Sequence, residues 1–159
     1  MNTSVLWLVA IAQIIHVLME ETPRFVNWAK NYNPKFDLKL FILGNSVIGG
    51  YILISLVLAT VYPSRWTLVL GLSTASFIFY NFLYHAYTTL SSGVYSPGVV
   101  TGGAISVPVA LYVYWACHSD GALSIGIAAA SILVGFLPML LIIKSIGIKP
   151  HNVQENVRT

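Results

Sequence analysis

The chain has 159 residues, of which 57% are hydrophobic and only 8% are charged, and its mean hydropathy is strongly positive. A water-soluble domain of this size could not cover so much apolar surface with polar groups, so the composition excludes a soluble globular protein and predicts an integral membrane protein. The formal charge of +3 is explained by topology and contact with anionic lipid headgroups, and no nucleic-acid partner is expected.

Five apolar stretches follow one another along the chain, and each has the length that a membrane-spanning helix needs. They cover about residues 3–22, 39–62, 66–91, 98–117 and 122–144. We therefore predict an all-α fold, an integral membrane bundle of five transmembrane helices in one domain over residues 1–149, with a flexible cytoplasmic tail over residues 150–159. Cys117 is the only cysteine, which excludes an internal disulfide and a metal cage of several cysteines.

The first stretch lacks the basic leader and the small-residue cleavage site of a signal peptide, so we expect it to remain as a true span. The connection that follows, from Pro23 to Asp37, is the longest polar segment between the predicted spans and mixes aromatic with basic residues. That mixture is typical either of a short helix lying on the bilayer surface or of a basic loop.

Basic residues are distributed unevenly between the two ends of the predicted bundle. Seven of them lie between the first two spans or after the fifth, namely Arg24, Lys30, Lys35, Lys39, Lys144, Lys149 and Arg158. Only Arg65 falls at the opposite end. Because the side that retains Lys and Arg is usually the cytoplasm, we predict an outside N-terminus and a cytoplasmic C-terminus in a multi-pass protein of the plasma or inner membrane.

Ionisable residues stand at the end of the otherwise apolar first span. His16 and Glu20 are four residues apart, which places them on one face of a helix, and Gln13 falls on the same stripe. A charged side chain inside the hydrocarbon layer costs roughly 2.5–3.5 kcal/mol on insertion scales. Chains seldom carry such a group without a partner or a task, so this stripe is a candidate site.

The predicted topology brings further polar residues to the same depth. Asn81 and His85 of the third span are again four residues apart, and His85 lies as far from the cytoplasmic end as His16 does. Asn45 lies near the start of the second span, and Tyr95 shortly precedes the fourth. Polar groups from four segments therefore converge on one level in the cytoplasmic half, which favours a shared site over scattered substitutions.

Three short motifs carry a family resemblance. They are His16 with Glu20-Glu21, Asn81 with His85, and Tyr95-Ser96-Pro97-Gly98. Their order and spacing resemble the HXXEE family of small integral membrane proteins, which has His-x-x-Glu-Glu, Asn-x-x-x-His and Tyr-x-Pro-Gly motifs, and the resemblance covers about residues 5–145. One departure is that this chain reads His-x-x-x-Glu-Glu. The family has no known biochemical function, so the resemblance implies an architecture and site residues but no reaction.

Our first hypothesis is an enzyme that uses acid–base chemistry on a hydrophobic, lipid-like or isoprenoid-like substrate, of the isomerisation or cyclisation type. The candidate catalytic residues are His16, Glu20, Glu21, Asn81 and His85. The candidate substrate-binding residues are Gln13, Asn45, Phe77, Tyr84 and Tyr95. A histidine and a carboxylate in apolar surroundings are suited to exchanging protons, and aromatic faces would stabilise a carbocation.

Two alternatives use the same residues differently. His16, Glu20 and His85 form a two-histidine, one-carboxylate set that suits non-haem iron or zinc, so the cofactor is either absent or one divalent metal ion. In the other alternative the protein is a non-enzymatic lipid-binding or structural membrane protein, and the polar cluster only fixes helix packing. The expected partners are membrane lipids and a hydrophobic small molecule, and a homo-oligomer is compatible with the sequence.

Overall fold

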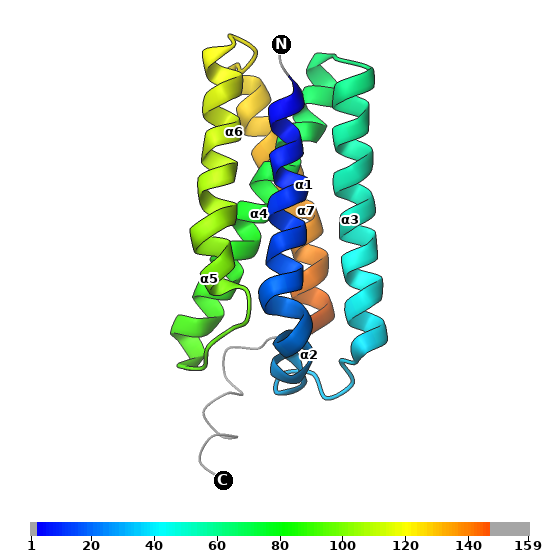
Figure 1. The fold of residues 1–159 in the computed structure, drawn as a ribbon, viewed down its shortest axis with the longest axis vertical. Coiled ribbons are helices and arrows are strands. Elements are labelled where there is room, and N and C mark those ends of the chain that lie inside the picture. Colours follow the sequence, from blue (N-terminus) through cyan, green and yellow to red (C-terminus); the bar gives the residue numbers. More distant parts are fainter. Residues whose placement is uncertain (1–2, 147–159) are drawn as a thin grey trace.

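The computed structural model describes residues 3–146, which form helices joined by short connections (Figure 1). In chain order the helical elements are η1 (Thr3–Trp7), α1 (Leu8–His16), η2 (Val17–Glu21), α2 (Thr22–Lys30), α3 (Leu38–Val61), α4 (Arg65–Ser92), α5 (Val99–Thr101), η3 (Gly102–Ser106), α6 (Val107–Ser119) and α7 (Ile125–Ile146). η1 is a 3₁₀ turn, whereas η2 and η3 are π-helical turns within longer helices. The expected tail over residues 150–159 lies outside the described residues.

Five of the described helices are long and apolar enough to cross a membrane. They are Thr3–Glu20, Leu38–Val61, Arg65–Ser92, Val99–Ser119 and Ile125–Lys144. The predicted all-α bundle of five spanning helices is therefore confirmed, and it makes the chain a multi-pass membrane protein by the length and composition of its helices. The orientation of the two ends stays a prediction.

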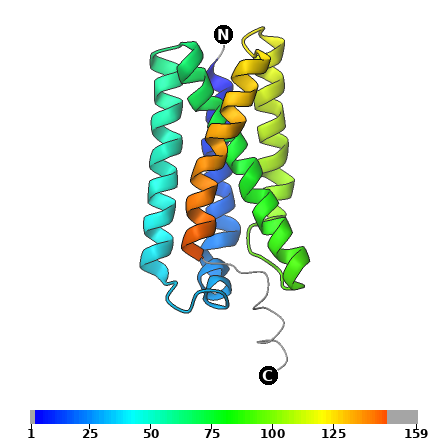
Figure 2. The same ribbon diagram turned by 180° about the vertical axis from the view of Figure 1, so that it is seen from behind.

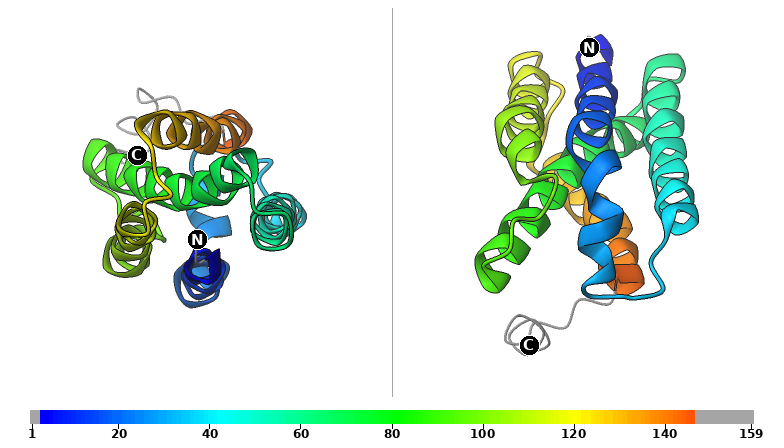
Figure 3. Two further views of the ribbon diagram at one scale, coloured as in Figure 1. Left: turned by 90° about the horizontal axis from the view of Figure 1, so that it is seen from above. Right: turned by 60° about the horizontal axis from the view of Figure 1, so that its bottom comes forward.

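Helix α4 occupies the centre of the bundle. Seen from above, it lies between α7 on one side and a layer of α1, α3 and α6 on the other (Figure 3). From behind, α7 crosses in front of it (Figure 2). The sequence suits this place because the buried residues of α4 include small and hydroxyl-bearing ones, such as Gly71, Ser73 and Thr74, which permit close approach of neighbouring helices. The Ser73 and Thr74 hydroxyls donate to backbone carbonyls of their own helix.

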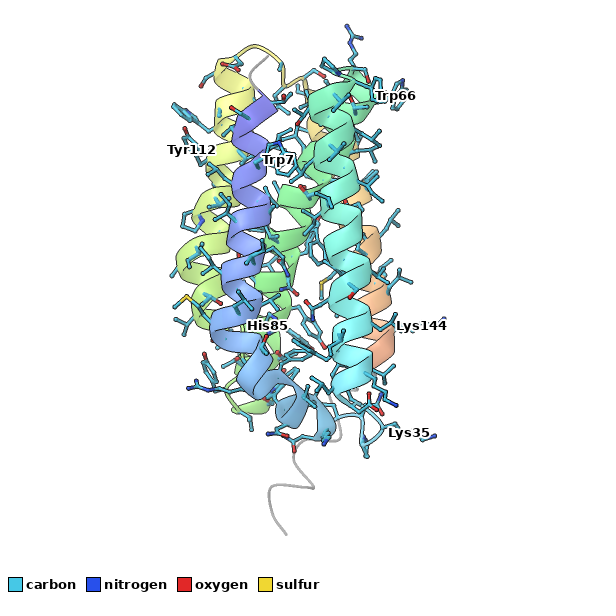
Figure 4. All side chains as sticks on the ribbon, turned by 45° about the vertical axis from the view of Figure 1, so that its right-hand side comes forward. Trp7, Lys35, Trp66, His85, Tyr112 and Lys144 are labelled. Carbon is cyan, nitrogen blue, oxygen red and sulfur yellow. The ribbon has the colours of Figure 1, made fainter. Side chains whose placement is uncertain are left out.

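The surface of the bundle suits a lipid environment. Large aliphatic side chains are exposed on α3, α6 and α7, among them Ile54, Leu111 and Leu141. Trp66 and Tyr112 lie in the upper half, whereas Lys144 lies in the lower half and Lys35 near the lower end (Figure 4). Aromatic residues are typically enriched at both membrane interfaces, and lysines lie near the ends of spans, as expected of helices that cross a bilayer.

The connection between the first two spans contains a helix with a buried apolar face. α2 continues from η2 at the lower end of the bundle (Figure 3, right). Phe25, Trp28 and Ala29 are buried, and the Phe25 ring centroid lies 5.9 Å from that of His85. The sequence favoured a surface helix and a basic loop equally. The structure has the helix, but its apolar face packs into the protein instead of lying against lipid.

Candidate functional site

The site lies in the lower half of the bundle, where the first span, α4 and the start of the fourth span meet. His16 and His85 are each 1% exposed, and their ring centroids are 5.5 Å apart. His16 ends α1, and His85 lies on the buried face of α4 (Figure 4). The two histidines that were expected at one depth are therefore direct neighbours.

The Glu20 carboxylate caps the N-terminus of the fourth span. The backbone N–H groups of Val100 and Thr101 donate to it, over 3.3 Å to Oε1 and 2.7 Å to Oε2. The Thr101 hydroxyl donates to Oε2 over 2.6 Å, and the Tyr95 hydroxyl donates to Oε1. A helix end needs acceptors for its first N–H groups. Gly98, the N-cap residue of α5, carries no side chain, so Glu20 supplies the acceptor from another helix.

These contacts suit an ionised carboxylate. An ionised carboxylate only accepts hydrogen bonds, and Glu20 meets four donors. Its side chain is 5% exposed, and a buried charge is tolerated only where such donors replace water. The positive end of the helix dipole adds to the stabilisation.

A directed chain of hydrogen bonds joins Glu20 to α4. Because the Thr101 hydroxyl donates its proton to Glu20, it accepts from His16 Nδ1 over 2.8 Å. His16 therefore carries a proton on Nδ1. The Asn81 amide nitrogen, which only donates, lies 3.0 Å from His16 Nε2. The order of donation is Asn81 to His16, His16 to Thr101 and Thr101 to Glu20.

The π-helical turn η2 explains the unusual spacing of the first motif. A π turn holds one more residue than an α turn, and such turns occur frequently at functional sites. η2 begins directly after His16 and ends at Glu21. The extra residue is accommodated within this turn, so that His16 and Glu20 both still contact Thr101. The second π turn, η3, begins immediately after Thr101.

The Tyr-x-Pro-Gly segment contacts both buried ionisable residues at once. Tyr95 donates to Glu20, and the Ser96 hydroxyl lies 2.9 Å from His85 Nδ1. Gly98 has a φ of +114°, and a Cβ atom there would lie 2.6 Å from His85 Nε2. The glycine is required both by its backbone conformation and by the imidazole packed against it. The sequence analysis named Pro97 and Gly98 as part of a family motif but predicted no contact between Gly98 and His85.

A pocket with a free volume of about 70 Å³ lies beside His85. Six residues expected from the sequence line it: Gln13, Asn45, Phe77, Asn81, Tyr84 and His85. Its exposed lining residues, Leu40 and Gly44, both belong to α3, so the pocket opens between helices toward the lipid-facing side. The pocket is large enough for the end of a molecule and not for a whole lipid.

Three aromatic residues of the pocket were not expected from the sequence. Phe25, Phe36 and Phe41 are buried, and the Phe25 ring centroid lies 5.8 Å from each of the other two. Together they form an aromatic wall of the pocket. The signal that identifies α2 as a packed helix is the spacing of Phe25, Trp28 and Ala29, which places all three on one helical face.

Not every candidate residue reaches the pocket. His16, Glu20 and Tyr95 belong to the hydrogen-bonded network, but none of them lines the pocket. The side chain of Glu21 lies outside the described part of the structure. The expected set thus divides into residues that face the pocket and residues that hold the neighbouring helix ends in place.

The described side chains do not fit the metal alternative. Within residues 3–146, with Glu21 left aside, no three His, Cys, Asp or Glu side chains are arranged to share a metal ion. Both Nδ1 and Nε2 of His16 and both oxygens of Glu20 are in hydrogen bonds. These side chains are therefore better explained as a hydrogen-bonded network than as a set of metal ligands.

Comparison with known proteins gives one match. The sequence model of a family described as a protein of unknown function with HXXEE motif matches residues 7–113. This range includes all three motifs. Neither the curated proteins nor the solved structures contain a match to the chain.

Proposed function

The chain belongs to the HXXEE family, whose function is unknown, and we propose that it is a membrane enzyme that transfers protons at His85 to and from a hydrophobic substrate. The observation that carries this proposal is the pocket beside His85, in which a histidine stands among aromatic rings and uncharged amides. His85 lines the pocket, and the contact of its Nδ1 with the Ser96 hydroxyl orients the ring.

The reaction that suits this environment is a double-bond shift or a cyclisation. A protonated imidazole would add a proton to an alkene carbon, and the neutral imidazole would then remove a proton from a neighbouring carbon. The products contain the same atoms, and no oxidant is needed. The faces of Phe25, Phe36, Phe41, Phe77 and Tyr84 line the pocket and would stabilise the carbocation between the two steps.

Glu20 and His16 act as positioning residues in this proposal. Glu20 accepts a hydrogen bond from Thr101, Thr101 accepts one from His16, and His16 accepts one from Asn81. Asn81 lines the pocket, so this series of hydrogen bonds ends at an amide beside the substrate. Glu20, which the sequence offered as a candidate catalytic residue, is thus a positioning residue in this proposal, and His85 carries the proton transfer.

The substrate would enter from the lipid phase. The pocket opens at Leu40 and Gly44 on α3, and a hydrophobic molecule dissolved in the bilayer reaches this opening without crossing water. That route agrees with the composition of the pocket, which offers few polar groups and a largely aromatic wall.

A structural or lipid-binding role is the second candidate, and one observation favours it. Glu20 caps the fourth span through hydrogen bonds to both of its carboxylate oxygens, which is sufficient reason for a buried carboxylate without any chemistry. In this reading, the network only joins the first span to the fourth.

Deuterium incorporation tests the enzyme proposal. The protein in nanodiscs, in deuterated water, is incubated with lipids extracted from membranes of cells that make it, and the lipids are analysed by mass spectrometry. We expect carbon-bound deuterium in one lipid class, lowered about a hundredfold or more in His85→Gln, because general acid–base catalysis contributes at least that factor. The amide of Gln preserves a hydrogen-bonding group for Ser96.

The matched control for this experiment is His118→Gln, which changes an exposed histidine on α6. It should incorporate deuterium as the wild type does. Undiminished incorporation in a folded His85→Gln variant would remove His85 from the mechanism. Absence of deuterium from every lipid class with the wild-type protein would overturn the enzyme proposal in favour of the structural role.

Metal analysis separates the metal alternative from the proposed mechanism. We expect detergent-purified protein, prepared without chelator, to contain far less than one equivalent of iron or zinc by inductively coupled plasma mass spectrometry. His16→Ala and His85→Ala variants should show the same low content. Near-stoichiometric metal in the wild type that disappears in both folded variants would instead establish a metalloenzyme.

A further inference from the structure

Two buried polar atoms at the pocket have no partner among the described residues. They are Gln13 Oε1 and the Tyr84 hydroxyl, on side chains that are 9% and 8% exposed. Both residues line the pocket. Buried polar groups are normally hydrogen-bonded, and an exception calls for a missing partner. Trp28 Nε1 is also unpartnered, but Trp28 is not a lining residue.

We infer that the pocket binds the hydroxyl group of an alcohol with an apolar chain, with Gln13 Oε1 accepting the alcohol's proton and the Tyr84 hydroxyl donating to its oxygen. An amide oxygen only accepts, and the Tyr84 hydroxyl has a proton to donate. A hydroxyl group carries both the proton that Gln13 Oε1 accepts and the oxygen to which Tyr84 donates. A carbonyl or ether oxygen satisfies only Tyr84, and a hydrocarbon satisfies neither.

The remaining lining residues exclude a charged headgroup. They include no Asp, Glu, Lys or Arg, and Glu20 is turned away into its own network. An ammonium group would lose its water here without an opposite charge, and a phosphate or carboxylate would have only the imidazole of His85, which the proposed reaction uses for proton transfer. A neutral hydroxyl group is the polar end that this pocket accepts at least cost.

The volume and the opening of the pocket determine where the apolar chain of the alcohol lies. Its free volume of about 70 Å³ holds the hydroxyl end and a few carbons. The apolar chain then leaves through the opening at Leu40 and Gly44, past the aromatic walls and toward the lipid. A linear fatty alcohol and a prenyl alcohol share this chemistry, and the experiment below distinguishes them.

This inference rests on the proposed function in one respect, because it takes the pocket beside His85 as the substrate site. It deepens that proposal by naming the substrate class. Binding is measured without turnover, so the two ideas fail separately. If the wild type binds the alcohol and the ether equally but still incorporates deuterium, only the alcohol inference is overturned. Alcohol binding with no deuterium incorporation overturns only the enzyme.

The experiment measures binding of tritiated 1-dodecanol, its methyl ether and farnesol to immobilised protein in nanodiscs. We expect 1-dodecanol to bind about tenfold more tightly than its methyl ether. Gln13→Leu should remove this difference, because the amide oxygen is the group that recognises the alcohol proton. Tyr84→Phe should weaken both ligands about equally. Tighter binding of farnesol or of 1-dodecanol identifies the prenyl or the linear chain, and either result supports the inference.

A pair of glycines on α3 provides the control for location. A Cβ atom at Gly44 or at Gly49 meets nothing within 4 Å, but only Gly44 lines the pocket. Gly44→Leu should lower alcohol affinity at least tenfold by narrowing the opening, and Gly49→Leu should leave it unchanged. Equal affinity of the wild type for alcohol and ether, or a difference that persists in Gln13→Leu, would overturn the inference and assign the two polar atoms to water.

Discussion

Replacing Glu20 by Gln is expected to lower the free energy of unfolding by about 2–3 kcal/mol, because one of the two acceptor oxygens becomes a donor. Whichever oxygen is replaced, the new NH₂ group faces a backbone N–H, of Val100 at Oε1 or of Thr101 at Oε2. A buried donor then opposes a donor, and the N-terminus of the fourth span loses its cap. Titration of the detergent-purified protein with sodium dodecyl sulfate measures the change.

Tyr95→Phe is the matched comparison. It removes one donor to Glu20 and leaves the three contacts from Val100 and Thr101. Tyr95 is 42% exposed, so water can replace part of the lost hydrogen bond, and the loss should be about 1 kcal/mol or less. Equal losses in the two variants would show that Glu20 does not act as the helix cap.

Gly98→Ala is expected both to destabilise the protein and to displace His85. A non-glycine residue in an unfavourable positive-φ conformation costs about 1–3 kcal/mol, and φ here is +114°. The added methyl group would also lie 2.6 Å from His85 Nε2, so the imidazole must move. We therefore expect a lower midpoint of thermal unfolding in detergent together with loss of deuterium incorporation.

The control is Gly93→Ala, at the C-cap of α4. Its φ is +68°, and a Cβ atom there meets nothing within 4 Å. This variant has backbone strain without a clash, so its stability should fall by about 1 kcal/mol while proton transfer at His85 persists. If Gly98→Ala left proton transfer intact, the packing of Gly98 against His85 would have no part in the chemistry.

Glu20 is a residue whose role could not be inferred from its position in the sequence. The sequence indicated that Glu20 needs a partner, because any charged side chain in an apolar span is costly, whichever groups surround it. It assigned the residue an acid–base role. The structure instead places four donors around it, all of them on Tyr95, Val100 and Thr101. These partners come about eighty residues after Glu20 in the sequence, so no helical spacing relates them to it.

The connection between the first two spans illustrates the opposite case. The i, i+3, i+4 spacing of Phe25, Trp28 and Ala29 is present in the sequence and predicts an apolar helix face. What that face contacts is a separate question, because lipid and protein interior are both apolar. Only the position of α2 beneath His85 turns Phe25 into a wall of the pocket.

The sequence by itself determined the five apolar helices and the stripes that carry His16, Asn81 and His85, because hydropathy and helical period are properties of neighbouring residues. The tertiary structure decided which of these side chains face the pocket, which residue caps the fourth span, and how the π turn η2 accommodates the extra residue after His16. Those outcomes depend on contacts between helices far apart in the chain. In a bilayer such contacts depend on close packing and on single hydrogen bonds, which leave little trace in local composition.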